Sequence, residues 1–316
     1  MIVRRRLKWS IILRNAWPLL LLWTVWSGTA YVLFYHLGIT QIALPFAPIG
    51  VMGTALSIFL GFRNSSSYDR WWEARKIWGG IVNSSRTFAR QIITLGTRHH
   101  TKENVSADEL KDFHRDMIYR HLAWINALRF QLRGQVGSDQ WKEEMQKFLS
   151  AKELESLQGA RNKATQLILE QGKRTADATQ KGIFEDFRHM QIDNTLTELY
   201  NLQGACERIK NTPLPRQYDF FNFLFLHVFL LLLPLGLLET FEKSSLPALL
   251  IPLSVLAGFV FYIVEGVGRR NEDPFENRIT DTPMTALCRT IEIDLRQMLD
   301  EENIPEKVEP KDGFLF

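Results

Sequence analysis

The side chains that could catalyse a reaction or bind a metal are scattered in this chain. His99 and His100 are adjacent in a polar run without the ligand pattern of a structural metal site, so a solvated loop is favoured over a metal site. His114, Arg115 and Asp116 have the order of a kinase catalytic tripeptide, but no glycine-rich phosphate loop or magnesium motif accompanies them. We therefore expect no enzyme activity, no cofactor and no metal site.

Charge and cysteine content limit the possible partners. The formal net charge is +3, and no basic stripe with interleaved aromatic residues is present, which argues against nucleic acid. Cys206 and Cys288 are far apart and lie in polar segments, so we expect two reduced thiols rather than a disulfide.

Apolar residues are concentrated in four blocks, although the mean hydropathy of the whole chain is only −0.12. A helix needs about 20 mostly apolar residues to cross a bilayer. The blocks at 17–37, 45–62, 220–238 and 246–264 meet this requirement, and the second is the shortest. A cleaved signal peptide is the alternative for the first block, but the block is too long and no small-residue cleavage site follows it.

Lysine and arginine residues near the ends of the spans predict the orientation. The loop 38–44 has no basic residue. Basic residues instead precede the first span and follow the second: Arg4, Arg5, Arg6, Lys8 and Arg14, then Arg63, Arg70, Arg75, Lys76 and Arg86. Both termini and the long middle segment are therefore expected in the cytoplasm.

The polar parts of the chain have the periodicity of helices. Helices are predicted at 75–95, 110–132, 140–151, 154–172 and 183–209, with 171–181 as a loop. No segment alternates as a strand would. The expected fold is all-α, as one intertwined domain whose membrane helices continue into cytoplasmic ones. Its segments are 1–63 (the N-terminus and the first two membrane helices), 64–216 (cytoplasmic), 217–267 (the last two membrane helices) and 268–316 (cytoplasmic).

Polar residues inside the spans favour a conduit over a pump. Such residues mark a pathway or a helix contact. They are Thr54, Ser57, Asn222, His227 and Ser254, with Glu239 and Glu265 near the boundary. They form no chain of carboxylates for a proton relay, and the two halves show no inverted repeat of the kind that transporters use.

The second span presents one face that would suit a pore. At four-residue steps it carries Gly50, Thr54, Ile58 and Phe62. In a symmetric oligomer these residues would form stacked rings, and a hydrophobic ring can gate by dewetting. The alternative is that this face packs against other helices, and periodicity does not separate the two. Four spans enclose no pore by themselves, so a pore requires oligomerisation.

Four stretches of the chain then carry a specific family resemblance. The first runs from Gly61-Phe62-Arg63-Asn64 through Tyr68, Arg70-Trp71-Trp72-Glu73-Ala74-Arg75, Trp78-Gly79 and Asn83 to Ser85-Arg86. The others are CERIKNTPLP at 206–215, EDPF at 272–275 and CRTIE at 288–292. Over nearly its whole length the chain resembles the bacterial branch of the bestrophin family.

The resemblance implies a homopentameric channel with four membrane helices per subunit around an axial pore. It places a hydrophobic neck at Thr54, Ile58 and Phe62. Close bacterial relatives are expected to have an apolar residue at the first position, and a hydroxyl ring at Thr54 would wet more readily. A second constriction at the cytoplasmic exit maps to Ile183, with Phe184 and Phe187 as rivals.

The motif at the end of the second span is expected to brace the junction of membrane and cytoplasmic parts. Its residues are Arg63, Asn64, Arg70, Trp71, Trp72, Glu73 and Arg75. Interfacial tryptophans and arginines anchor helices at the headgroup level. We expect the arginines to pair with acids such as Glu73, Glu207 or Glu272, and not to coordinate ions.

The calcium clasp of animal bestrophins is degenerate here. The corresponding stretch, 274–281, has two scattered acids and an intervening arginine. Calcium prefers six to eight oxygen ligands. We expect no calcium gating through this site.

Ion selectivity is the least determined property, because the neck carries no formal charge. Resemblance to the bacterial branch implies a leaning towards Na⁺ and K⁺, in a bacterial inner membrane protein whose partners are copies of itself, lipid and monovalent ions. An anion-selective channel of the same architecture remains the first alternative. A membrane-anchored scaffold without ion flux and a transporter follow.

Overall fold

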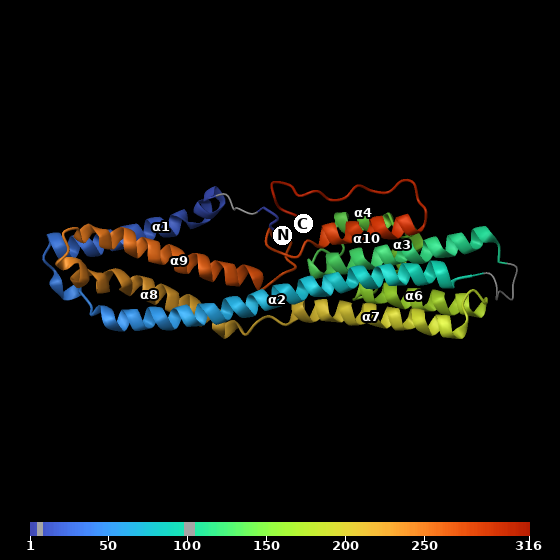
Figure 1. The fold of residues 1–316 in the computed structure, drawn as a ribbon, viewed down its shortest axis with the longest axis horizontal. Coiled ribbons are helices and arrows are strands. Elements are labelled where there is room, and N and C mark those ends of the chain that lie inside the picture. Colours follow the sequence, from blue (N-terminus) through green and yellow to red (C-terminus); the bar gives the residue numbers. More distant parts are fainter. Residues whose placement is uncertain (5–8, 98–104) are drawn as a thin grey trace. The chain divides into compact units, whose positions relative to one another are not determined.

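The computed structural model of the protein describes residues 1–4, 9–97 and 105–316. His99 and His100 lie outside these residues, as do Arg5, Arg6 and Lys8. The fold is all-α: in the described parts of the chain there are helices and two isolated bridges but no strand (Figure 1).

The described residues form ten α-helices, joined by a π-helical turn at Val32–His36 and 3-10 turns at Thr40–Ile42 and Pro247–Leu249. The helices are α1 (Trp9–Tyr31), α2 (Phe46–Leu95), α3 (Ala107–Leu132), α4 (Asp139–Gln146), α5 (Ala151–Ser156), α6 (Lys163–Gln180), α7 (Asp186–Asn211), α8 (Arg216–Glu242), α9 (Leu250–Asn271) and α10 (Met284–Met298).

The chain divides into two compact units, with the division in α2 falling between Trp71 and Trp72. The membrane unit comprises residues 4–71 and 213–273, and the helical unit comprises residues 1–3, 72–212 and 274–316. The sequence had indicated one intertwined domain with segment boundaries at 63/64, 216/217 and 267/268.

Four stretches of the described chain are long and apolar enough to cross a membrane: Ala16–His36, Thr40–Leu95, Arg216–Glu242 and Pro247–Asn271. They contain the four predicted spans except for Leu37 and Leu246, the end residues of the first and the fourth. In the membrane unit α1 packs on α8 and α9, and α8 packs on α9. The core there includes Trp23, Ile49, Leu56, Leu226 and Phe229.

Small residues allow the closest approaches in the membrane unit. A Cβ on Gly258 would lie 2.8 Å from the Trp23 ring, and one on Gly236 would lie 2.5 Å from the Ile49 Cδ1. The outer surfaces are apolar and exposed, for example at Leu22, Val25 and Leu256. Such surfaces suit contact with lipid or with another subunit.

One helix, α2, replaces two predicted elements. The span at 45–62 and the helix at 75–95 are joined without a break into 50 residues. Residues 63–74 contain neither glycine nor proline, so nothing in the connecting stretch terminates the helix. The expectation that a membrane helix continues into a polar one is confirmed in α2.

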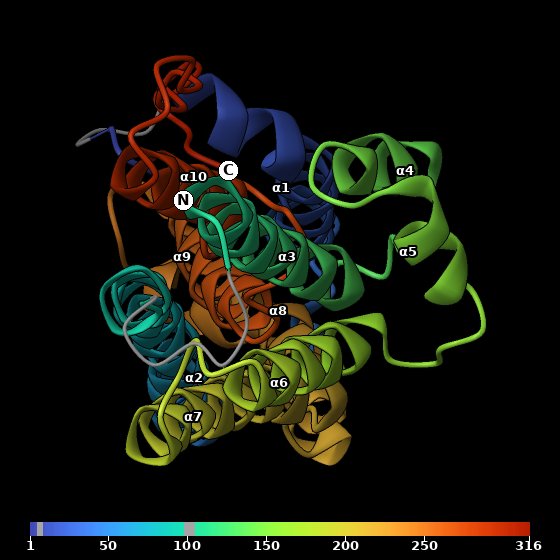
Figure 2. The same ribbon diagram turned by 90° about the vertical axis from the view of Figure 1, so that its right-hand side faces the viewer.

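The helical unit is built around α3, which lies between α10 and α6 in the end-on view (Figure 2). Its side chains from Met117 to Ile118 and from Leu122 to Ile125 are fully buried. Trp78 and Phe88 of α2 join the same core. Serine caps begin the helices: Ser106 and Glu109 form a capping box at α3, and Ser150 and Glu153 form another at α5.

The loop predicted at 171–181 is wrong. These residues continue α6 to Gln180, because Gln171, Thr175 and Ala178 recur on its buried face and Gly172 alone does not end a helix. The helix predicted at 140–151 is divided between α4 and α5, each with its own serine cap. The predicted helices at 110–132 and 183–209 correspond to α3 and α7 within three residues at each end.

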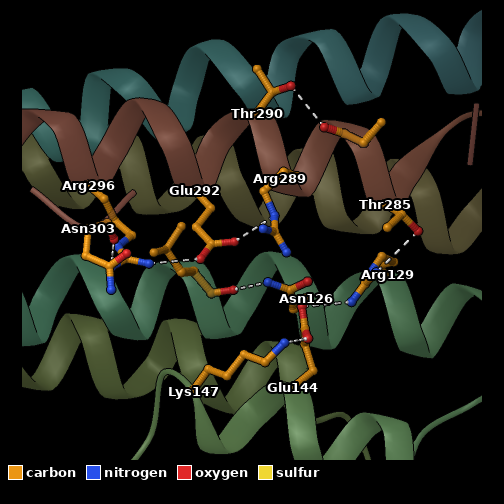
Figure 3. A network of polar contacts seen from close by, with 12 residues as sticks. Asn126, Arg129, Glu144, Lys147, Thr285, Arg289, Thr290, Glu292, Arg296 and Asn303 are labelled. Atoms are coloured by element: carbon orange, nitrogen blue, oxygen red, sulfur yellow. Dashed lines mark hydrogen bonds and ion pairs between the residues drawn. The ribbon is translucent and has the colours of Figure 1, made fainter. Parts of the chain in front are cut away.

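A hydrogen bond connects α10 to α3 in the helical unit, and ion pairs lie between α3 and α4 and within α10 (Figure 3). The buried Arg129 guanidinium donates to Thr285 Oγ1 and to Glu144 Oε1, both at 3.3 Å. The guanidinium groups of Arg289 and Arg296 lie 3.2 and 3.3 Å from the carboxylate oxygens of Glu292. The hydrogen bond between Arg129 and Thr285 joins segments that are 156 residues apart in the sequence.

Candidate pore face and junction

One face of α2 in the membrane unit is left uncovered by the rest of the subunit. Ile58 is 55% exposed and Phe62 is 71% exposed, and Thr54 is exposed on the same face. The opposite face, with Leu56 and Leu60, is buried. The face predicted for the neck is therefore not used for packing among the described helices of its own membrane unit.

The hydroxyl of Thr54 is turned to its own helix. Its Oγ1 donates to the Gly50 carbonyl oxygen at 3.0 Å, and Ser57 Oγ donates to Gly53 in the same way at 2.8 Å. This back-bonding satisfies the donor without a partner across the helix. It leaves the Thr54 methyl and the oxygen lone pairs to the exposed side.

Arg63, the residue after Phe62 on α2, binds three carboxylates. Its guanidinium pairs with Asp219 of α8, with Glu265 of α9 at 3.3 Å and with Glu272 at 3.6 Å. The side chains of Arg63, Glu265 and Glu272 are only 4–5% exposed. Buried charges persist when each is paired, so this cluster fixes α2 against α8 and α9.

Two further arginines balance the same acids at the surface. Arg216 approaches Glu272 at 3.5 Å, and Arg269 approaches Glu265 at 3.6 Å. A cavity of about 350 Å³ opens beside the cluster and beside Phe62. Phe59, Leu214 and Tyr218 also line it.

Asn64 lies at the contact between α2 and α9 and bonds to the backbone of both helices. Its Nδ2 donates to the Leu60 carbonyl at 2.9 Å and to the Val264 carbonyl at 3.0 Å. A Cβ on Gly268 would lie 2.9 Å from Asn64 Oδ1, so the glycine leaves room for the amide. Asn64 is thus a packing residue between the two helices.

The tryptophans of the motif lie where α2 passes from the membrane unit into the helical unit. Trp71 stacks on Tyr68 with ring centroids 6.2 Å apart, and Trp72 is 45% exposed. Arg70 Nε donates to the Glu272 backbone oxygen at 2.7 Å. Arg75 is half-buried and lies near the start of the part of α2 that belongs to the helical unit.

The expected acidic partners of the arginines are partly different. Glu272 does bind Arg63, but Glu73 pairs with Arg208 at 2.5 Å. Glu207 Oε1 accepts from the amides of Gln131, Asn162 and Gln203 at 2.8, 2.8 and 2.9 Å. The pairing was mispredicted because Asp219 and Glu265 come from α8 and α9, at sequence separations that local patterns do not reveal.

The three residues considered for the exit differ in exposure. Ile183 follows α6 and is 5% exposed, with its backbone bonded to Thr97 N and Ala178 O. Phe184 is 2% exposed and packs on the Phe113 ring. Phe187, in the first turn of α7, is 81% exposed. Of the three candidates, only Phe187 projects from the helical unit.

The two acids of the stretch 274–281 have partners within the helical unit. Glu276 pairs with Lys210, and Asp281 Oδ2 accepts from the Arg278 amide at 3.0 Å. Burial raises the pKa of Asp281 above its usual value. The absence of calcium gating stays a prediction.

One buried group was not singled out from the sequence. His121 of α3 is fully buried between the rings of Phe88 and Trp124, with Nε2 2.8 Å from Ser85 Oγ. Burial lowers the pKa of His121 to about 3. The sequence signal for the burial of His121 was its position in the apolar periodicity of the helix predicted at 110–132.

Comparison with known proteins adds a family. The family model described as bacterial/fungal bestrophin protein matches residues 3–297. A protein of Escherichia coli (strain K12), named voltage-dependent anion channel-forming protein YneE, is 30% identical over 88% of this chain and 83% of the relative. A protein of Mesorhizobium japonicum, named voltage-dependent anion channel-forming protein mll4386, is 32% identical over 85% of this chain and 79% of the relative.

Solved structures agree with the fold. The crystal structure of a bacterial bestrophin homolog from Klebsiella pneumoniae has a TM-score of 0.79 at 28% sequence identity. The match covers 90% of this chain and 98% of that chain.

Proposed function

Because this chain belongs to the bacterial and fungal bestrophin family, we propose that it forms a passive ion channel from five copies of itself. In this channel α2 of each subunit lines the axis, and Thr54, Ile58 and Phe62 form the neck. Family membership and the channel names of the relatives place the protein among channels and not among enzymes.

The observation that carries the proposal is the uncovered face of α2. Ile58 and Phe62 are 55% and 71% exposed on a helix that is long enough to cross a membrane, and the packed face of this helix is the opposite one, with Leu56 and Leu60. Exposed apolar residues in register on one helix favour contact with a lumen or with symmetry copies. Rings of this kind gate by dewetting.

We assign the second constriction to Phe187 in place of Ile183. A ring that narrows a pore needs side chains that project from the subunit, and Phe187 is 81% exposed whereas Ile183 is 5% exposed. The aromatic side chain would form a hydrophobic ring on the helical unit, comparable in chemistry to the neck.

We propose that the channel conducts Na⁺ and K⁺ in preference to anions, as the resemblance to the bacterial branch implies. The second candidate is an anion channel, which is favoured by the names of the relatives, all called anion channel-forming proteins. None of the three neck residues carries a charge, so charged residues in the vestibules must set the preference for cations or anions.

The proposed location is the bacterial inner membrane, with both termini and the segment 64–216 in the cytoplasm. The basic residues that flank the spans support this orientation, and the loop 38–44 without lysine or arginine supports an exterior position for that loop. Lipid and other copies of the chain are the proposed partners of the exposed apolar helix surfaces.

The deciding experiment is the reversal potential of the purified protein in a planar bilayer under a KCl gradient. A reversal near the potassium equilibrium value supports the cation channel, and one near the chloride value supports the anion channel. A protein of five copies that carries no current at any voltage or pH would contradict both and support a scaffold. Saturating flux that depends on a counter-ion would identify a transporter.

A further inference from the structure

Asp69 lies on the same face of α2 as the neck residues. Successive residues of an α-helix turn by about 100°, so seven residues bring a side chain back to within about 20° of its starting direction. Asp69 follows Phe62 by seven residues and Ile58 by eleven, and its direction falls midway between theirs. It is exposed, as they are.

Asp69 also differs from the other acids at this end of the membrane unit. Asp219, Glu265 and Glu272 are all held by Arg63. Asp69 makes no ion pair or hydrogen bond with any described residue, and the positions three and four away on α2 (Ser65, Ser66, Trp72 and Glu73) are not basic. Its carboxylate is therefore not neutralised by a basic partner among the described residues.

We propose that Asp69 determines the charge preference of the channel, as a ring of five carboxylates placed about two turns beyond Phe62. This inference rests on the proposed pentameric channel and names the group that selects the ion. Rings of Asp or Glu are the elements that attract cations in cation channels. The neck then sets the width of the pore, and Asp69 sets the sign of the ion that enters it.

The expected size follows from screened electrostatics. The distance from Phe62 to Asp69 along the helix is about 10 Å, close to the Debye length of about 10 Å at 0.1 M salt. A ring of five carboxylates with a radius of about 10 Å would enrich a monovalent cation at its centre roughly fourfold over bulk. The enrichment grows as the salt concentration is lowered.

The test compares reversal potentials of the full-length protein and Asp69→Asn in planar bilayers under a KCl gradient, at two salt levels. Neutralising the ring should lower the ratio of potassium to chloride permeability about fourfold or more, with the larger change at low salt. Glu242→Gln removes an exposed carboxylate of the membrane unit that lies at the end of α8 instead, and it should leave the ratio unchanged. An Asp69→Asn ratio equal to that of Glu242→Gln overturns the inference.

A second variant tests the same position without relying on the asparagine protein. Cys206 and Cys288 are 0% and 3% exposed, so an added thiol at Asp69→Cys is the accessible one. An anionic methanethiosulfonate reagent should restore the wild-type reversal potential, and a cationic one should shift it further towards the chloride value. Labelled protein whose reversal potential does not move with either reagent overturns the inference.

Different results would contradict the proposed channel function and the proposed role of Asp69. If the wild type and both variants carry no current, the proposed channel function is wrong. If currents flow and respond to Phe62→Ala but not to changes at Asp69, the channel stands and only the role of Asp69 is rejected.

Discussion

The guanidinium of Arg63 is enclosed by carboxylates from α8 and α9 and from the residue after α9, and two of these are as inaccessible to water as the arginine itself. Removing one partner of a buried ion pair leaves an uncompensated charge, which costs about 3–5 kcal/mol. We expect Arg63→Ala to lower the unfolding temperature strongly in a thermal melt in detergent.

The matched control is Arg208→Ala. Arg208 is 63% exposed in its pair with Glu73, and exposed pairs contribute about 0–1 kcal/mol. Equal shifts for the two variants would contradict the structural role given to Arg63.

Phe62 and Ile58 project from α2 with more than half of their surface exposed. Replacing either by alanine removes most of a side chain from the proposed ring and should widen it, so we expect a higher single-channel conductance. Phe220→Ala removes an equally exposed ring from α8 and should leave conductance unchanged. Unchanged currents in both neck variants would contradict the neck assignment.

His121 predicts a pH dependence of stability. Its pKa in the fold is about 3, against 6.5 for the ordinary value, so only the unfolded chain takes up the proton between these limits. Stability is therefore retained above pH 6.5 and falls by about 1.4 kcal/mol per pH unit as the pH drops below it, until about pH 3. Thermal melts of wild type and His121→Gln at pH 7.5 and 5 measure the difference.

The glutamine variant should lose less stability than the wild type over this range, because it has no imidazole to protonate in the unfolded state. Parallel pH profiles for the two proteins would contradict the assignment of the slope to His121.

At the level of the elements, hydropathy alone located the four spans, because a membrane-length apolar run needs no tertiary information. The same reasoning missed the length of α6, where Gln171 and Thr175 look like loop residues and yet are buried in the fold. Side chains such as these are polar in the sequence and become interior only when α3 and α7 pack around them.

The candidate site shows the same limit. The row Thr54, Ile58 and Phe62 could be predicted because it repeats on one helix. Of the partners of Arg63, Glu272 was predicted, but Asp219 and Glu265 were not, since they come from helices more than 150 residues away. The sequence favoured Ile183 over Phe187 for the second constriction, although only Phe187 projects from the helical unit. The two residues are four positions apart, and the sequence does not show which of two apolar side chains near a turn is buried.

The packing of α1 on α9 gives a prediction about a pair of glycines. A Cβ on Gly258 would meet the Trp23 ring at 2.8 Å, whereas nothing lies within 4 Å of one on Gly28. Gly28→Ala should stabilise slightly, by about 0.5–1 kcal/mol, because alanine is the better helix former. Gly258→Ala should instead lower the unfolding temperature. A gain in both variants would show that the Trp23 ring moves without cost.

At the level of the whole molecule, five copies are expected around the axis. Native mass spectrometry of the detergent-solubilised protein should give a single assembly of five subunits. A monomer or dimer as the largest species would remove the pore, since four spans cannot enclose one.

The helical unit is assembled from segments on either side of the second membrane hairpin. Its core takes Met284, Cys288 and Ile291 from α10, which packs on α3. On the ribosome, the face of α3 that packs on α10 therefore stays uncovered while about 150 further residues, from α4 to the start of α10, are made, which takes about 8–30 s at about 5–20 residues per second. A nascent chain that stops before α10 cannot close this core, so quality-control proteases can recognise an incomplete subunit before it meets its neighbours.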